Sequence, residues 1–527
     1  MRLDTIIENA QVVTLDPERP TAGRIGLWRG RVVGLDDDVA GLDAVEMIDA
    51  GGAAVLPGFI DSHTHLQLTG QGLLAIDISA AGTVDEALTI IADGSASFAP
   101  EQWVEISGYD QRVIGRDLTA AELDRAAGGR KAWARHISSH SSVISSSVIR
   151  DIPGAVDRDF AERNLGVLHE VEQDLVRAQR LPFSLDEAGR TIEIAAEAAR
   201  RQGVTFCMDA GAGGRIGSLN PLDISTHLRL LESGRIPVRM QLMPSLDALH
   251  PVLGGHGDGF ERGLDVGLRT GLGSDRLRIG ALKVVIDGGM MVRTARLTEP
   301  YEGSDERGQY SIDPEDLIAG IVDGHRAGWQ LAVHAIGDEA IDVAIEAFRQ
   351  AASHGGTIDR RHRIEHGGLI RPDQISVLAG LGIAIVSQPS FLYDSGDDFV
   401  AQMGVSRAPW LYRGRSLTDA GIRIVGSTDR PLAGSPLRAV QVLADRTSSS
   451  GAIIGDGEQL TVAEALNTVT VNGAWIAGME DRLGRVASGF LADFTVLERS
   501  PIDVDISEIA AIGVRATVLD GAWNEVS

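Results

Sequence analysis

Residues 57–66 read PGFIDSHTHL, an apolar run that ends in two histidines one residue apart. The run has the composition of a buried β-strand, and residues i and i+2 of a strand point to the same side. His63 and His65 can therefore direct both imidazole rings at one point beside the end of the strand. Two converging neutral imidazoles are a natural start for a metal site, although two ordinary polar residues at a strand end would give the same pattern.

The chain beyond this motif alternates helical and strand-like segments. Between residues 185 and 429, helical stretches end in a glycine and lead into short apolar runs, as RTIEIAAEAARRQ leads into VTFCMDA. Glycine ends helices in a left-handed conformation, and strands that are apolar on both faces are covered on both sides. Repeated units of this kind indicate a parallel sheet. We therefore expect an α/β fold built on a (β/α)8 TIM-like barrel.

Nine runs qualify as strands of this barrel, which is one more than the barrel needs. They are LPGFIDSH, AWARHIS, VTFCMDA, VRMQLMP, LKVVIDG, LAVHAIGD, RIEHG, IAIVSQP and IVGSTD. We expect one of the nine to lie outside the barrel. Active sites of such barrels lie at the C-terminal ends of the strands, so the residues that close these runs are the candidates for chemistry.

Short β-rich runs separated by turn residues occupy both ends of the chain. We expect residues 1–55 and 480–527 to form one small β-sandwich domain that flanks the barrel, with the barrel itself at 56–479. A long segment at about 66–130 separates the first two barrel strands. We interpret this segment as an insertion of the kind that builds a lid or a pocket wall.

Polar residues close several of the predicted barrel strands. His334 closes LAVH, His366 closes RIEH, and Asp429 closes IVGSTD. Polar groups that are buried need partners. One shared metal would supply a partner for these three residues together with His63 and His65.

Lys283 lies inside the apolar run ALKVVID. Burial lowers the pKa of a lysine and favours the neutral amine. A neutral amine can react with carbon dioxide to give a carbamate, an anion able to bridge two metal ions. Two other interpretations stay open, since the side chain could instead extend to the rim of the barrel or pair with Asp287.

Composition limits the partners of the chain. Its 527 residues include 48 Lys+Arg and 74 Asp+Glu, for a formal net charge of -26. Nucleic acids and anionic membranes need a basic surface, so we expect neither as a partner and expect a small-molecule substrate. The first residues lack a signal-peptide pattern and no run has the length of a membrane helix. With a single cysteine, Cys207, this favours a cytoplasmic protein, and a homo-oligomer stays open.

The motifs resemble those of the amidohydrolase superfamily of metal-dependent hydrolases. The resemblance covers nearly the whole chain and is carried by HTH after PGFID, the lysine on a middle strand, VHAIGD, RIEHG and GSTD. It is closer to one branch, the amidohydrolase family 3-like proteins around N-substituted formamide deformylase. The features of that branch are GYDQ at 108–111, SSHSSVISSS at 138–147, LKVVIDGGMMVRTA and EPY at 299–301.

The resemblance implies a ligand set and a reaction. By position, the metal ligands are His63, His65, Lys283, His334, His366 and Asp429. A carboxylated Lys283 would bridge a binuclear metal centre of two zinc ions, with manganese or iron as alternatives. The implied enzyme is a hydrolase of carbon–nitrogen bonds other than peptide bonds. It would cleave an amide, an N-substituted formamide or a cyclic amide by a metal-bound hydroxide, with Asp429 as proton shuttle.

Five further residues are candidates for the substrate pocket. His140 and Arg293 are candidates for stabilising the oxyanion, although a structural histidine and a structural salt bridge would explain them as well. Tyr109, Gln111 and Tyr301 are candidates for substrate binding.

Two other functions remain as alternatives. The first is a mononuclear deaminase of the same superfamily, against which the bridging lysine counts. The second is a non-catalytic binding or assembly protein on the same fold, against which the retention of all six ligands counts.

Overall fold

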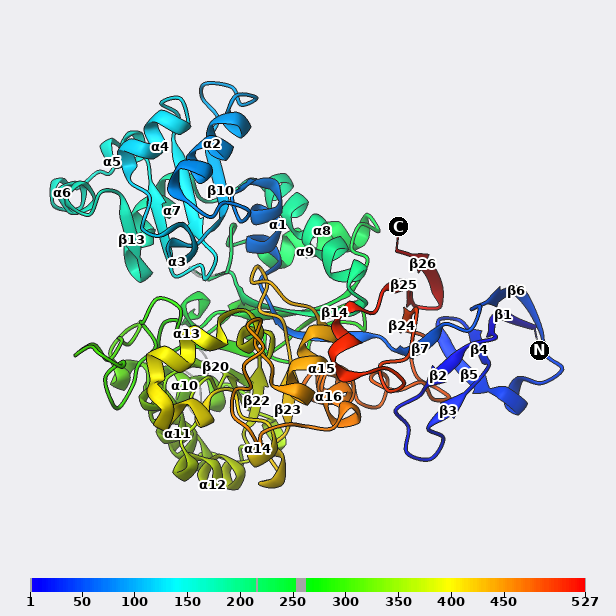
Figure 1. Cartoon of the computed structure of the whole chain (residues 1–527). Coiled ribbons are helices and arrows are strands. Elements are labelled where there is room, and N and C mark those ends of the chain that lie inside the picture. Colours follow the sequence, from blue (N-terminus) through cyan, green and yellow to red (C-terminus); the bar gives the residue numbers. More distant parts are fainter. Residues whose placement is uncertain (1, 215–216, 253–261, 527) are drawn as a thin grey trace.

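The computed structural model, which describes residues 2–214, 217–252 and 262–526, has parallel strands at its centre (Figure 1). They pair as two sheets, with the orders β18–β15–β14–β8 and β19–β20–β21–β22–β23. The strands are β8 (Phe59–Thr64), β14 (Val204–Ala212), β15 (Arg239–Pro244), β18 (Leu277–Ile279), β19 (Leu282–Val285), β20 (Leu331–Ala335), β21 (Arg363–His366), β22 (Ala384–Ser387) and β23 (Ile424–Gly426). The predicted α/β fold is confirmed.

The two parallel sheets share one interior core. Buried side chains from both sheets form a single cluster, which includes Ile60, Phe206, Met208, Met243, Ala332, Val386 and Val425. At one join, Ser245 forms a parallel bridge with Lys283. At the other, the backbone N–H of Asp429 donates to the carbonyl of His63 over 2.9 Å. The arrangement is TIM-barrel-like, but in the described part of the chain the strand ladders do not close into one ring.

Eight of the nine runs expected from the sequence lie in these two sheets. The ninth, AWARHIS, forms β11 (Ala132–His136) in a separate sheet, so it is the run outside the central strands. The additional parallel strand is β18, which pairs with β15. It was not expected because it has only three residues, and only Gly280 and Ala281 separate it from the longer apolar run of β19.

The segment that follows β8 builds a sheet of its own, with the order β13–β12–β11–β10–β9. Besides β11 its strands are β9 (Ile76–Asp77), β10 (Val104–Tyr109), β12 (Ser141–Ile144) and β13 (Val167–His169), accompanied by α2 (Val84–Ser95), α4 (Ala120–Ala126) and α5 (Ser146–Arg150). Figure 1 shows this sheet at one end of the molecule. The segment expected as an insertion, about 66–130, holds β9 and β10, and the same sheet continues to His169.

Helices alternate with the central strands and pack on their outer side. They include α8 (Leu185–Arg201), α9 (Asp223–Glu232), α10 (Pro314–Arg326), α11 (Asp338–Ala352), α12 (Pro372–Leu381) and α15 (Pro436–Asp445). Ser184 and Glu187 form a capping box at the start of α8. Gly382 ends α12 with φ of 65°, as a left-handed cap requires. On α11, Ile341, Ala344 and Phe348 are fully buried in the largest core cluster.

Further α-helices connect these elements. They are α1 (Leu66–Leu74), α3 (Gln111–Ile114), α6 (Ala155–Arg163), α7 (Asp174–Arg180), α13 (Ser390–Arg407), α14 (Arg415–Asp419), α16 (Val462–Thr468) and α17 (Val471–Ile476). Among the described residues, none of the helices has the length and apolar character needed to cross a bilayer.

The N-terminal segment forms one more sheet by itself and a second one together with the C-terminal segment. One is β5–β4–β1–β6, made of β1 (Arg2–Glu8), β4 (Ile25–Trp28), β5 (Arg31–Leu35) and β6 (Asp43–Asp49). The other is β26–β25–β24–β7–β2–β3, made of β2 (Gln11–Val13), β3 (Thr21–Ala22), β7 (Ala54–Pro57), β24 (Phe494–Leu497), β25 (Val514–Leu519) and β26 (Ala522–Glu525). Ile7, Leu27, Val55 and Phe494 share one buried cluster. Both termini lie at this end of the molecule (Figure 1).

Candidate metal centre and active site

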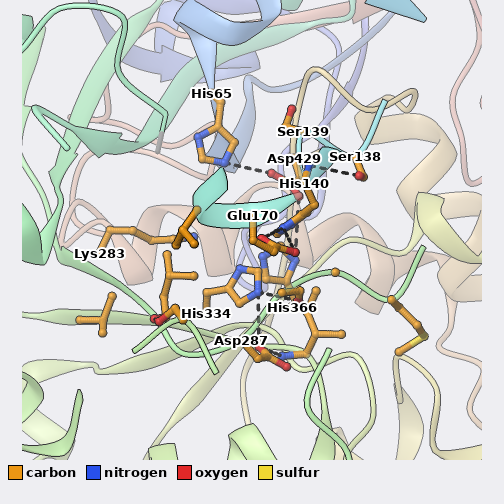
Figure 2. Close-up of a pocket in the computed structure, with 18 of the residues that line it drawn as sticks. His65, Ser138, Ser139, His140, Glu170, Lys283, Asp287, His334, His366 and Asp429 are labelled. Carbon is orange, nitrogen blue, oxygen red and sulfur yellow. Dashed lines mark hydrogen bonds and ion pairs between the residues drawn. The ribbon is translucent and has the colours of Figure 1, made fainter. Parts of the chain in front are cut away.

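A cavity of about 460 Å³ opens at the C-terminal ends of the central strands. Five of the six predicted ligand residues line it, namely His65, Lys283, His334, His366 and Asp429 (Figure 2). The sixth, His63, is fully buried beside them, with its Nε2 atom 3.1 Å from Lys283 Nζ. The six residues therefore meet at one place, although they come from five separate parts of the chain.

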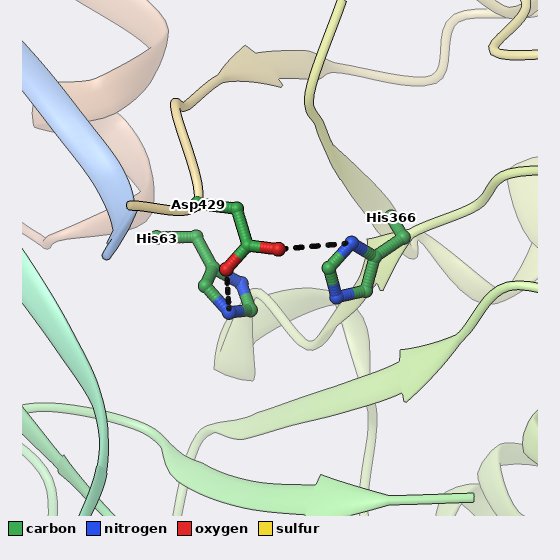
Figure 3. Close-up of side chains that lie close together, drawn as sticks. All are labelled: His63, His366 and Asp429. Atoms are coloured by element: carbon green, nitrogen blue, oxygen red, sulfur yellow. Dashed lines mark ion pairs between the residues drawn. The ribbon is translucent and has the colours of Figure 1, made fainter. Parts of the chain in front are cut away.

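Asp429 lies between two of these histidines (Figure 3). Its Oδ1 atom is 3.6 Å from His63 Nε2, and its Oδ2 atom is 4.0 Å from His366 Nδ1. Ligand atoms of these three residues all lie within 4.8 Å of one another. His366 Nδ1 is buried and has no hydrogen-bond partner among the described residues. Because an unpartnered buried nitrogen is costly, the group fits a divalent metal well.

Hydrogen bonds at Nδ1 fix the orientation of the two histidines of the HTH motif. His63 Nδ1 is 2.5 Å from a carboxylate oxygen of Glu365, and His65 Nδ1 is 2.8 Å from the carbonyl oxygen of Ala210. In each ring the Nδ1–H group donates, so Nε2 is left as the acceptor that faces Asp429. Partners of this kind set the tautomer of metal-binding histidines. Glu365 was not expected from the sequence, although an acid inside the apolar run RIEH was a usable signal.

The surroundings of these side chains favour the protonation states of metal ligands. Burial lowers the pKa of His63 to about 4 and the pKa of His366 well below its usual value. For Asp429 burial acts in the opposite sense, but the surrounding histidines outweigh it and hold the pKa of the carboxyl well below its usual range. Neutral imidazoles and an ionised carboxylate are the forms that bind a metal.

Lys283 is enclosed in the centre and is only 4% exposed. Burial lowers the pKa of its amine to about 8. Extension to the rim of the barrel is therefore not observed. The carboxylate of Asp287 accepts hydrogen bonds from three backbone N–H groups instead, those of Arg296, Ile336 and Gly337. No ion pair joins Asp287 to Lys283 in the described structure.

His334 lies next to His366, with 4.4 Å between the ring centroids. Its Nε2 atom is 3.2 Å from the carbonyl oxygen of Gly288 and 3.4 Å from Asp287 Oδ1. Asp287 therefore supports His334, a role that was not expected from the sequence. The signal for it was a buried acid two residues after β19.

His140 lines the same cavity, on the turn between β11 and β12. Its Nδ1 atom is 2.9 Å and 3.1 Å from the two carboxylate oxygens of Glu170, and its ring centroid is 6.2 Å from that of His334. Burial opposes protonation of the ring, but the charge of Glu170 outweighs it and raises the pKa of His140. The residue is thus near the predicted ligands without being grouped with them.

The other four pocket candidates lie elsewhere, and none is among the described residues that line the cavity. Arg293 is exposed. Tyr109 is buried in the sheet β13–β12–β11–β10–β9, called the insertion sheet below, and its hydroxyl donates to Asp117. Gln111 begins α3. Tyr301 is buried and donates to the carbonyl of Ala295 over 2.8 Å.

The apolar wall of the cavity comes from residues that the sequence did not single out. They are Leu246, Met290, Met291, Phe391, Phe399 and Tyr412. Most lie in loops or in α13, whose path over the strand ends is not encoded in any local pattern. A signal for Met290 and Met291 was present in the GGMM run that follows Asp287.

Comparison with known proteins agrees with this geometry. Residues 46–523 match a protein family described as the amidohydrolase family. N-substituted formamide deformylase of Arthrobacter pascens is 26% identical over 540 residues, which cover 98% of this chain and 97% of that protein. An uncharacterized metal-dependent hydrolase of Pyrococcus horikoshii has a similar structure, with a TM-score of 0.77 at 23% identity over 96% of this chain and 99% of that one. A metal-dependent hydrolase of Pyrococcus furiosus gives 0.74 at 25% identity, over 95% and 100%.

Proposed function

Because this chain belongs to the amidohydrolase family, and is thereby a metal-dependent hydrolase of C–N bonds, we propose that its substrate is an amide, an N-substituted formamide or a cyclic amide. The observation that carries the proposal is the buried group of His63, His366 and Asp429 at the base of the cavity, in which His366 Nδ1 has no described partner. A mononuclear deaminase or a protein without catalysis would have less use for Lys283 in the same group.

The residues of the centre divide into two sets by position. His63, His65 and Asp429 surround one point, and His334 and His366 lie beside it. Nitrogen and carboxylate ligands of this kind suit zinc, with manganese or iron as alternatives. A bound divalent ion supplies an activated water and polarises the substrate carbonyl.

Lys283 is proposed to carry a carbamate. Its ammonium loses one proton to give the neutral amine, which adds to carbon dioxide and loses a second proton, so that a cation is replaced by an anion between the two sets of ligands. The support is its burial, the lowered pKa and the 3.1 Å distance from His63 Nε2. Two dications close together repel strongly, so an anion at this position would allow a second ion to bind.

Asp429 is proposed as the proton shuttle. Its carboxylate lines the cavity, so it can accept a proton from the attacking water and pass it to the leaving nitrogen as the C–N bond breaks. His140, which lines the same cavity beside His334, would donate a hydrogen bond to the carbonyl oxygen as its charge develops. The exposed position of Arg293 gives no support to the same role for that residue.

The wall of the cavity favours a substrate with an apolar group beside the scissile bond. Leu246, Met290, Phe391, Phe399 and Tyr412 supply that wall. The similarity to N-substituted formamide deformylase over nearly the whole chain supports a formamide with an apolar N-substituent as the first substrate to try.

The test is a screen of zinc-loaded and manganese-loaded protein against N-substituted formamides, N-acyl amino acids, hydantoins and lactams. Amine release and carboxylate release are measured separately. We expect both products in equal amounts from at least one class, and neither after chelation. Ammonia release from a C=N substrate, with no amide cleaved, would favour the deaminase instead.

The finer architecture is also a proposal. The shared interior core supports a closed (β/α)8 barrel at 56–479, and the common cluster of the two terminal sheets supports a β-sandwich of residues 1–55 and 480–527. The net charge of -26 supports a small-molecule partner over nucleic acid or membrane. The cytoplasmic location and a homo-oligomer stay predictions.

A further inference from the structure

Glu170 reaches the cavity from the insertion sheet, beside His140. Strands β12 and β13 are antiparallel, and they pair Ser141 with His169. Residue 140 precedes this pair and residue 170 follows it, so the same end of the two paired strands carries both residues side by side. The backbone N–H of Glu170 donates to the carbonyl of His140 over 2.9 Å. The end of the insertion sheet thus places Glu170 and His140 next to each other in the wall of the cavity.

The side chains of Glu170 and His140 are also hydrogen-bonded to each other. Both carboxylate oxygens of Glu170 are within 3.1 Å of His140 Nδ1, which leaves Nε2 as the ring nitrogen available to a ligand (Figure 2). Both side chains are mostly buried, with 21% and 15% exposure for His140 and Glu170. Glu170 also has φ of 44°, in the left-handed region that a non-glycine residue adopts at a cost.

The barrel holds this pair from the other side, through the loop after β19. Thr294 Oγ1 donates to a carboxylate oxygen of Glu170 over 2.6 Å, and it accepts from the N–H of Gly289 over 2.9 Å. A Cβ atom on Gly288 would come within 2.7 Å of Glu170 Oε1, and one on Gly289 within 2.9 Å of His140 Cδ2. Because these two glycines have no side chain, the pair of Glu170 and His140 can occupy the space beside them.

We propose that Glu170 is a positioning residue of the hydrolytic site, which holds His140 through Nδ1 so that Nε2 faces the substrate beside His334. The inference rests on the proposed function and adds to it a residue that follows β13. Carboxylates orient imidazole rings in the same manner in metal sites and in acyl-transfer sites. A packing role alone would not need an ionised side chain, since burying a carboxylate is unfavourable unless its charge is used.

The kinetic test compares Glu170→Ala, Glu170→Gln, His140→Ala and the double variant Glu170→Ala/His140→Ala. We expect Glu170→Ala and His140→Ala each to lower kcat by roughly 10²–10³, the scale for losing one oxyanion donor, with little change in KM. The double variant should be no slower than His140→Ala, because Glu170 acts through His140. Glu170→Gln keeps an acceptor oxygen and should fall between Glu170→Ala and the wild type.

The matched control is Glu172→Gln. Glu172 lies on the same 3-10 helix, η2 (Glu170–Gln173), and its carboxylate accepts from the backbone N–H of His169 over 2.9 Å. We expect its kcat to equal that of the wild type. Wild-type kcat in Glu170→Ala, or a double variant much slower than both single variants, would overturn the inference.

A second measurement does not depend on activity. Crystal structures of the wild type and of Glu170→Ala give the orientation of the His140 ring, and we expect the ring to leave its place beside His334 in the variant. Should Glu170→Ala not fold, Thr294→Val removes one hydrogen bond to Glu170 and should shift the same ring. An unchanged ring in the variant that folds would overturn the inference. A wild type that cleaves no amide would overturn the proposed function alone, and the ring orientation would still decide the role of Glu170.

Discussion

At the scale of single residues, Lys283 is unusual because it is a buried lysine in a chain that contains very few lysines. The chain has only two lysines, Lys131 and Lys283, against 46 arginines. Lys131 is partly exposed and pairs with Asp151 over 2.7 Å. Lys283 is enclosed next to His63, with its pKa lowered to about 8. Arginine stays charged at any ordinary pH and cannot form a carbamate, so the choice of lysine at 283 matches the chemistry proposed there.

The carbamate can be detected directly. In the presence of ¹³C-labelled bicarbonate, we expect one carbamate resonance from wild-type protein and from Lys131→Arg. Lys283→Arg should lack it, because the guanidinium does not add to carbon dioxide. Lys283→Ala should bind fewer ions than the one to two per chain expected for the wild type, and short carboxylic acids should restore part of its activity. A resonance that persists in Lys283→Arg would contradict the assignment.

Asp429 allows a second prediction at this scale. Asp429→Asn keeps the size of the side chain and the backbone contact to His63, but the amide cannot accept and release a proton. We expect kcat to fall by roughly two to four orders of magnitude, the scale of a general acid–base group. Steady-state kinetics with metal analysis of the same sample would check this. Near wild-type kcat at full metal content would assign proton transfer to another group.

At the scale of elements, the loop after β19 leaves room for His140. Gly289 does not need a left-handed backbone, so Gly289→Ala meets only the steric contact of 2.9 Å with His140 Cδ2. We expect a displaced ring and a kcat lowered by about tenfold or more, up to the 10²–10³ scale of a lost donor. Gly356→Ala is the matched control, since its Cβ would meet nothing within 4 Å. Equal kinetics of the two variants would show that the ring tolerates the contact.

The elements also show why some of the site was predictable from the sequence and some was not. His63, His334, His366 and Asp429 each close an apolar run, and parallel strands bring such ends to one edge regardless of the loops. The convergence of the candidate ligand residues could therefore be predicted from local pattern. Their supports could not, because Glu365 contacts His63 across 302 residues of chain and from the other parallel sheet, so the contact depends on how the two sheets pack together.

The residues that were expected to bind substrate lie away from the cavity for a related reason. Tyr109 belongs to the core of the insertion sheet, and Tyr301 to a cluster with Met290 and Phe391. Both are aromatic residues in distinctive motifs, but whether their side chains face the cavity depends on how whole segments of the chain pack against the central strands. AWARHIS was ambiguous in the same way, because a buried strand has the same sequence pattern in the insertion sheet as in the central sheets.

At the scale of the whole molecule, the candidate centre joins the two parallel sheets. His63 comes from the sheet that contains β8, whereas His334 and His366 come from the sheet that contains β20 and β21. A metal held by both would link sheets whose ladders are not continuous. A ligand that binds only the folded state stabilises it, by about 2.7 kcal/mol at a free concentration about 100-fold above Kd.

We therefore expect zinc to raise the melting temperature of chelator-treated protein by several degrees, and to restore hydrolysis in proportion to the ions bound. Calorimetry of one preparation at increasing zinc, with metal analysis at each step, measures both. His366→Ala should lose most of the shift, because His366 is a proposed ligand from the second sheet. His354→Ala, at an exposed position on the outer side, should keep all of it. An equal shift in His366→Ala would mean that zinc acts elsewhere on the protein, and full activity of the metal-free chain would remove the metal from the mechanism.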